Sequence, residues 1–381
     1  MSVARTSRLL VDVHTHVYLP RYADLLRSRT NVPRILTNSS GEERLVILKD
    51  EPSGGRPVGP QYWDRGQKLS FMDKHGIDIS LVSSANPWLD FLSPSSAESA
   101  AADLNQDLEE YCSSSPAVSS EASLRRLYGF GLLPLVPGVS SSAVLESVKQ
   151  ISSLPHLKGL ILGTRGVGKG LDDPELNPVW DAVAQAGLVV FLHPHYGVDA
   201  RAWGDVDNGH VLPLALGFPF ETTVAATRMI LSGVFDRHPN LRLLLAHSGG
   251  ALPQLSSRLA SCIAHDPVVA SRLKHDARYY LGKIYYDAVS YGPEEMRFTS
   301  DVISRADSYV SSETARVAAD CKVGAKRMMF GTDHPFFPPL SSTEMWKSVV
   351  ENLNSIDTVQ GWGQQEKDSV RGGNALELFG L

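Results

Sequence analysis

The sequence predicts an α/β fold, a (β/α)8 TIM barrel formed by one domain over residues 1–381. Two observations lead to this prediction. Apolar, β-branched runs recur eight times along the chain, and segments of helical pattern lie between most of them. Four of these runs have a histidine or an aspartate at or just beyond their end. Barrels of this type carry their catalytic residues at the ends of strands.

The eight runs are mostly apolar, which is typical of parallel strands covered on both faces. An open, doubly wound sheet is the competing architecture, but it would show a glycine-rich dinucleotide loop after an early strand. Here the first strand ends in His14-Thr15-His16. We expect strands at residues 9–13, 79–83, 127–135, 160–163, 188–192, 241–246, 283–289 and 328–330, and helices at 142–153, 177–186, 221–235 and 252–263.

Two long segments interrupt the alternation. Residues 20–61 are polar, rich in proline and glycine, and contain Leu45-Val46-Ile47-Leu48. We interpret them as a small insertion after the first strand, with a hairpin over the mouth of the barrel. Residues 197–217 form a second long loop, after the fifth strand. Loops this long in a domain are usually functional or disordered.

Composition and charge limit the partners. Hydrophobic residues make up 43% of the 381 residues, and the formal net charge is −6. This balance gives no reason to expect a nucleic-acid partner or a basic membrane-binding face. No signal peptide is recognisable, and no apolar stretch could span a bilayer. The three cysteines lie far apart, with no C-x-x-C pair. We therefore expect a cytoplasmic protein with reduced thiols and a small-molecule substrate.

The strand ends predict a metal site. His14 and His16 are two residues apart on a strand, so both imidazoles face the same side. His193 and Asp333 complete a set that suits one Zn²⁺ ion with an open position, although Mn²⁺, Fe²⁺ or Co²⁺ would also fit. His247, before Ser248-Gly249-Gly250, is either a further ligand or an acid/base beside the metal.

These motifs resemble the amidohydrolase superfamily, and within it the decarboxylase branch typified by aminocarboxymuconate-semialdehyde decarboxylase. The resemblance implies that His14, His16, His193 and Asp333 bind one metal ion, while His247 acts on the metal-bound water or on the substrate. The chain offers no lysine at a strand end between strands four and five, which favours one metal over two. Arg258 matches an arginine that implies a homo-oligomer, a dimer or a dimer of dimers.

A narrower resemblance is to the fungal uracil-5-carboxylate (isoorotate) decarboxylases. It is carried by Gly209 to Leu214 and by residues 84–88, 168–174, 193–197 and 333–339. By this resemblance Arg56 binds the anionic substrate. Asn86 has an amide suited to the edge of a pyrimidine, and Phe336 could cover a flat ring or pack in the core. By strand alternation, His195 would point the same way as His193 and reach the substrate.

Three functional hypotheses remain open at this stage. The first is a decarboxylase that converts uracil-5-carboxylate to uracil and CO₂ without an organic cofactor, or that acts on another aromatic or muconate carboxylate. In it, Asp333 or His247 supplies the proton. The second is a zinc-dependent hydrolase of a lactone or cyclic amide, with the same ligands activating a water molecule. The third is a catalytically silent barrel that binds a partner. The metal motif alone does not separate the first two.

Overall fold

A computed structural model describes residues 9–49, 51, 54–119, 123–198, 203–310, 318–339, 341 and 344–381. At its centre lies a sheet of eight parallel strands whose spatial order follows the chain. The strands are β1 (Val11–Val17), β5 (Ile79–Ser84), β6 (Leu127–Leu132), β7 (Leu157–Leu162), β8 (Val189–Leu192), β9 (Arg242–Leu245), β10 (Tyr285–Asp287) and β11 (Met328–Met329). They correspond one to one to the eight predicted strands.

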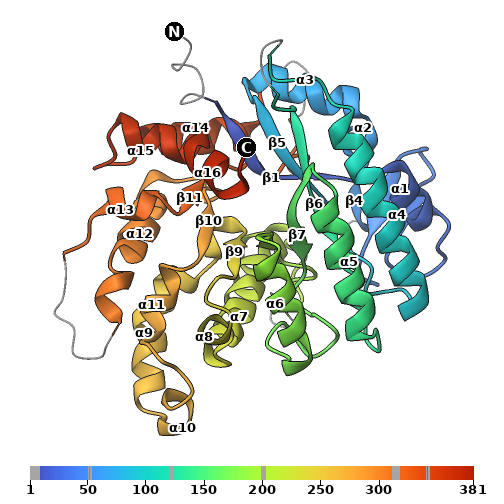
Figure 1. The fold of residues 1–381 in the computed structure, drawn as a ribbon. Helices are drawn as coiled ribbons and strands as arrows, with labels where there is room; N and C mark the ends of the chain where they lie inside the picture. The colour runs from blue at the N-terminus through green and yellow to red at the C-terminus, as the bar shows by residue number, and fades with distance from the viewer. Residues whose placement is uncertain are drawn as a thin grey trace.

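The first and last strands meet and bring the sheet close to closure. The Val13 N–H donates to the Phe330 carbonyl at 3.0 Å, and the His16 N–H donates to the His334 carbonyl at 2.7 Å. The Asp333 N–H donates back to the His14 carbonyl at 2.8 Å. In Figure 1 the colours follow one another once around the strands. The predicted (β/α)8 barrel is confirmed.

Helices cover the outside of the strands (Figure 1). α5 illustrates how the sequence forms them: the Ser140 side chain accepts the Ala143 N–H at 3.2 Å at its start, and Val144, Val148 and Ile151 form its buried face. The longer helices are α1 (Pro20–Arg27), α3 (Arg65–His75), α4 (Pro94–Ser113), α5 (Ser141–Ser153), α6 (Asn177–Gln185), α7 (Phe218–Leu231), α9 (Leu252–Ala264), α12 (Pro293–Ser304) and α14 (Lys347–Thr358).

Short helical segments complete the described chain. The α-helical ones are α2 (Pro60–Trp63), α8 (Val234–Arg237), α10 (Pro267–Ala270), α11 (Ala277–Leu281), α13 (Cys321–Ala325), α15 (Gln364–Asp368) and α16 (Asn374–Phe379). The 3₁₀ and π segments are η3 (Pro174–Leu176), η5 (Pro213–Gly217), η6 (His247–Gly249), η7 (Ala306–Tyr309) and η8 (Ser369–Gly373). No described helix is both long and apolar enough to cross a membrane.

Most element boundaries differ from the predictions by up to about three residues, and two differences change the description of an element. β1 continues to Val17, because Thr15 and His16 pair with Val82 and Ser83 of β5. His14 and His16, two of the predicted metal ligands, therefore lie inside the strand and not after it. The helix expected at residues 221–235 is divided into α7 and α8, because Gly233 between them adopts φ 71°.

The insertion after β1 contains the expected hairpin. β2 (Arg34–Thr37) pairs antiparallel with β3 (Glu43–Val46), which pairs in turn with β4 (Arg56–Pro57). Gly55 precedes β4 with φ +92°, and a Cβ there would lie 2.2 Å from the Leu45 carbonyl oxygen. Only glycine allows this approach, so Gly55 fixes where the next residue, Arg56, joins the small sheet.

Candidate active site

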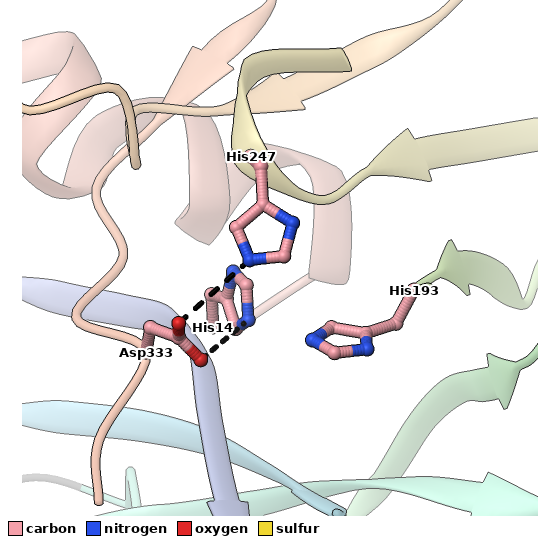
Figure 2. A group of neighbouring side chains, drawn as sticks. All are labelled: His14, His193, His247 and Asp333. Atoms are coloured by element: carbon pink, nitrogen blue, oxygen red, sulfur yellow. Dashed lines mark ion pairs between the residues drawn. The ribbon is translucent and has the colours of Figure 1, made fainter. Parts of the chain in front are cut away.

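The four predicted metal ligands converge at the C-terminal end of the barrel. His14 and His16 lie on β1, His193 directly follows β8, and Asp333 follows β11. His14 Nε2 is 3.1 Å from His16 Nε2, and Asp333 Oδ1 lies 3.3 Å and 3.4 Å from these two atoms. The His193 ring centroid is 4.8 Å from that of His16 and 5.1 Å from that of His14. Figure 2 shows His14, His193 and Asp333 facing one another.

In each of the three predicted ligand histidines, the ring nitrogen that points away from the cluster, Nδ1, has a hydrogen-bond partner. His14 Nδ1 lies 2.6 Å from Asp287 Oδ2, His16 Nδ1 lies 3.0 Å from Ser83 Oγ, and His193 Nδ1 lies 2.8 Å from the Pro194 carbonyl oxygen. A carboxylate and a carbonyl accept only, so Nδ1 of His14 and His193 carries the proton. In the neutral form of each ring, Nε2 then keeps a free lone pair, as metal-binding histidines require.

Orphaned polar atoms show that the cluster fits a cation. Among the described residues, His193 Nε2 and Asp333 Oδ1 are buried without a hydrogen-bond partner. Buried polar groups without a partner are rare and imply a missing ion, water or ligand. His14, His193, His247 and Asp333 also have ligand atoms within 4.8 Å of one another. His247 is therefore a second candidate for the place that the sequence assigned to His16.

Burial and nearby charges shift the pKa values of these imidazoles in different directions. Burial lowers the pKa of His16 to about 4 and, together with its neighbouring imidazoles, holds the pKa of His193 well below its usual value. Burial also acts to lower the pKa of His14, but the carboxylates of Asp333 and Asp287 outweigh it and raise that pKa to about 10. Two carboxylates thus face a buried group of histidines, which favours a bound positive charge.

Asp333 presents its two oxygens to different neighbours. Oδ1 faces His14 and His16, while Oδ2 lies 3.7 Å from His247 Nε2 (Figure 2). Burial would raise the pKa of Asp333, but the surrounding histidines hold it well below the usual value, so the carboxylate is ionised. Asp333 and His247 have φ 56° and 54°, a left-handed conformation that costs a residue other than glycine about 1–3 kcal/mol. Strain of this kind is concentrated at functional sites.

Asp287, at the end of β10, is a site residue that the sequence analysis missed. Besides His14 Nδ1, its carboxylate accepts the backbone N–H groups of His247 at 2.9 Å and Ser248 at 2.8 Å. It therefore joins a ligand-type histidine to the strained turn that carries His247. The signal was present in the sequence: Asp287 is the only charged residue in its run after Lys283.

A second buried group supports the seam between β1 and β11. Asp12 accepts the Thr332 hydroxyl at 2.8 Å and the His14 N–H at 3.1 Å. Lys68 of α3 is 1% exposed, and its Nζ lies 2.9 Å from His334 Nδ1 and contacts the Thr15 hydroxyl. Burial raises the pKa of Asp12 and lowers that of Lys68, and the two charges partly offset these effects. No role for Lys68 was predicted from the sequence.

The four predicted substrate residues line one cavity. Arg56, Asn86, His195 and Phe336 contribute to its wall, and its volume is about 570 Å³. Its other walls come from the insertion and from residues 203–214 of the second long loop, so both long segments contribute to the cavity. The Phe336 ring lies edge-on to the His16 ring, with centroids 5.5 Å apart, which joins the cavity to the histidine cluster.

Arg56 is held in this wall but keeps a free donor. Its Nη2 donates to Asn86 Oδ1 at 3.2 Å, and its guanidinium carbon lies 4.8 Å from the centroid of the Phe336 ring. Its Nε is buried without a hydrogen-bond partner. A guanidinium in this state can bind a carboxylate or a carbonyl oxygen.

His195 lies in the cavity wall, but its ring is turned to other partners. β8 ends at Leu192, so strand alternation does not orient a side chain three residues further on. The ring stacks on Tyr196, with centroids 4.0 Å apart, and Nε2 lies 3.2 Å from Asp90 Oδ1. The atom of His195 that faces the predicted substrate residues is its carbonyl oxygen, which accepts Asn86 Nδ2 at 2.6 Å.

Known proteins share this architecture over the whole chain. The amidohydrolase family model matches residues 11–381. The 2-amino-3-carboxymuconate-6-semialdehyde decarboxylase of Dictyostelium discoideum is 26% identical over 98% of this chain and 92% of its own. An apo crystal structure of IDCase from Metarhizium anisopliae has 39% identity and a TM-score of 0.85, covering 99% of this chain and 98% of that one.

A more distant structural relative was solved with a metal ion. It is the 5-carboxyvanillate decarboxylase of Novosphingobium aromaticivorans, complexed with manganese and 4-hydroxy-3-methoxy-5-nitrobenzoic acid. It is 18% identical, with a TM-score of 0.69 over 99% of this chain and 97% of that one. At this identity the likeness establishes the shared fold.

Proposed function

Because this chain belongs to the amidohydrolase family, we propose that it is a metal-dependent decarboxylase that converts uracil-5-carboxylate to uracil and CO₂. One observation carries the proposal. A cluster of ligand-type histidines and Asp333 adjoins a cavity whose wall holds Arg56 with an unpaired buried donor. The likeness to IDCase, an isoorotate (uracil-5-carboxylate) decarboxylase, supports the choice of substrate.

His14, His16, His193 and Asp333 would hold the ion. When bound, a divalent ion would supply positive charge that attracts the substrate's carboxylate and stabilises negative charge on the ring. Neutral imidazoles and one carboxylate suit Zn²⁺, the ion we propose, and the same donors accept Mn²⁺, the ion bound in the structural relative. No organic cofactor is required, because the ring itself takes up the electron pair of the broken bond.

The protein's part at the other end of the substrate is to bind and orient it. The Arg56 guanidinium would donate to an oxygen of the anionic substrate, with its plane already fixed by Asn86 and Phe336. The exposed part of Phe336 offers an apolar surface to a flat ring. Holding the ring in one orientation beside the proton donor makes the proton transfer effectively intramolecular.

The reaction exchanges a carboxylate for a proton on one ring carbon. His247 and Asp333 form the proton-carrying pair, with His247 Nε2 3.7 Å from Asp333 Oδ2. In the proposed order, this pair delivers a proton to carbon 5. The bond from carbon 5 to the carboxylate then breaks, its electron pair returns to the ring, and CO₂ leaves. Side-chain acids of this kind contribute about 10²–10⁴-fold to rate.

The assembly state remains a proposal from resemblance. Arg258, which suggested a homo-oligomer, lies on an exposed part of α9 and is free to meet a second copy of the chain. A dimer or a dimer of dimers is the expected state, and sedimentation would measure it.

The proposal is tested by supplying metal-loaded protein with a panel of carboxylates, while CO₂ and the organic product are recorded. The panel contains uracil-5-carboxylate, 2,6-dihydroxybenzoate and 6-methylsalicylate. We expect CO₂ and uracil from the first compound at the highest kcat/KM. A ring-opened product carrying ¹⁸O from labelled water would instead identify a hydrolase. Turnover of a benzoate alone would keep the decarboxylase and reject the pyrimidine substrate.

A further inference from the structure

A continuous line of hydrogen bonds runs from Glu221, outside the cavity wall, to the guanidinium of Arg56. Glu221 Oε2 accepts three successive backbone N–H groups, from His195 at 3.0 Å, Tyr196 at 3.1 Å and Gly197 at 2.6 Å. Its Oε1 accepts the hydroxyl of Thr164. Glu221 lies in the first turn of α7, so it ties this helix to the segment that follows β8.

The line continues through the backbone of the residue that Glu221 holds. The His195 carbonyl accepts Asn86 Nδ2 at 2.6 Å, and Asn86 Oδ1 accepts Arg56 Nη2 at 3.2 Å. Each bond orients the next group: the fixed carbonyl determines which end of the Asn86 amide is the donor, and the other end must then accept. Asn86 is 1% exposed, which leaves its amide little room to rotate away.

We infer that Glu221 is a positioning residue for substrate binding, which acts on Arg56 through the His195 backbone and the Asn86 amide. This inference rests on the proposed function for its kinetic consequence, since Arg56 is the proposed substrate-binding group. It also changes the role of Asn86. With Oδ1 and Nδ2 both engaged, Asn86 orients the arginine more than it contacts the pyrimidine edge.

The ionised form of the residue matters in this geometry. Three N–H groups point at one carboxylate oxygen, and hydrogen bonds to an ionised acceptor are about twice as strong as neutral ones. Glutamine in its place would have one oxygen and one NH₂ group. The NH₂ group would face either the backbone N–H groups, which is a donor-to-donor clash, or Thr164, whose hydroxyl would then have to turn and accept. In both orientations the negative charge that strengthens the three N–H contacts is lost.

The kinetic test is a double-mutant cycle between Glu221 and Arg56. Glu221→Gln should raise KM for uracil-5-carboxylate about 10-fold, within the range for coupled residues, with metal content unchanged. In the Arg56→Ala background the same substitution should change KM less than about 2-fold, because its target is gone. An equal rise of KM in both backgrounds, or loss of bound metal, would overturn the inference.

Two further variants separate positioning from folding. Thr164→Val removes one donor to Glu221 and should raise KM in the same direction by a smaller factor. Asp266→Asn is the matched control, because Asp266 accepts two backbone N–H groups, each at 3.1 Å, at the start of the distant α10. It should lower the melting temperature without changing KM. If Asp266→Asn raised KM as much as Glu221→Gln does, the effect would reflect general destabilisation of the protein and not positioning of Arg56.

A crystal structure of substrate-free Glu221→Gln tests the same inference without reference to turnover. We expect the residue 195–197 backbone to shift and the bond from Asn86 to Arg56 to lengthen beyond hydrogen-bonding distance. Unchanged positions of Asn86 and Arg56 would overturn the inference, whatever the substrate. Failure of the wild type to convert uracil-5-carboxylate would instead count against the proposed function alone.

Discussion

The two ends of the site are built from different kinds of structure. At the metal end, His14 and His16 lie on a barrel strand, and Nδ1 of His14, His16 and His193 has a hydrogen-bond partner. At the substrate end, Arg56 comes from a two-residue edge strand of a small sheet and is held by one amide and one aromatic ring. The first end is therefore fixed by the fold, and the second depends on loops.

We infer from this difference that the metal end carries out the chemistry and that the substrate end determines which substrate binds. Residues on barrel strands can be varied little without disturbing the sheet, whereas loops over the mouth can change with little effect on stability. We expect substitutions at the metal end to abolish turnover, and those at the substrate end to change KM and leave the ion in place. The following predictions test this division, from the largest expected effect to the smallest.

Asp333→Asn should cause the largest loss, at least about 10²–10⁴-fold in kcat, because an amide cannot accept a proton from His247 and relay it. It is also a weaker metal ligand, so some metal should be lost as well. Steady-state kinetics with metal analysis measure both effects. Asp357→Asn, which changes a surface carboxylate paired with Arg371, is the control and should keep wild-type kcat. A kcat for Asp333→Asn near that of the control would remove Asp333 from the chemistry.

Asp287→Asn should weaken metal binding about 10- to 100-fold, as loss of a partner behind a ligand histidine typically does. Asp287 also holds the His247 turn, so kcat should fall even at saturating metal. Ser83→Ala, which removes the neutral partner behind His16, should have a smaller effect on affinity. Competition with a chelating dye measures both variants. Equal metal affinity in Asp287→Asn and wild type would contradict the bracing role.

Arg56→Ala should raise KM by about 10- to 150-fold, the equivalent of roughly 1.5–3 kcal/mol for a hydrogen bond to a charged group. Metal content should stay at the wild-type level, since Arg56 is not a ligand. Arg34→Ala, on the far strand of the same small sheet, is the control and should keep wild-type KM. A wild-type KM for Arg56→Ala with every carboxylate tested would exclude Arg56 from the binding site.

The sequence could predict that the residues of the metal end lie together, because strand ends are readable from periodicity. His14, His16, His193 and Asp333 each stand at or just beyond an apolar run, and the barrel brings such positions together. Asp287 was missed although its strand was predicted correctly. The prediction considered the residues at or after the end of each strand, and Asp287 lies inside the predicted run 283–289.

At the substrate end, Arg56 could be predicted only through resemblance. The place of Arg56 depends on the pairing of β4 with β3 and on the close approach at Gly55, neither of which has a periodic signature. The orientation of His195 was inferred from alternation, a rule that stops where β8 stops. Glu221 carries no signal at all, since an acidic residue in the first turn of a helix is common for its charge alone.

The most direct test of the account is the fate of the proton. Metal-loaded protein is given uracil-5-carboxylate in deuterated water, and the uracil formed is examined by NMR. The account predicts deuterium at carbon 5, because the hydrogen that replaces the carboxylate comes from the exchangeable acid pair of His247 and Asp333. A ring-opened, water-added product in place of uracil, or an unconsumed substrate in fully metal-loaded protein, would contradict it.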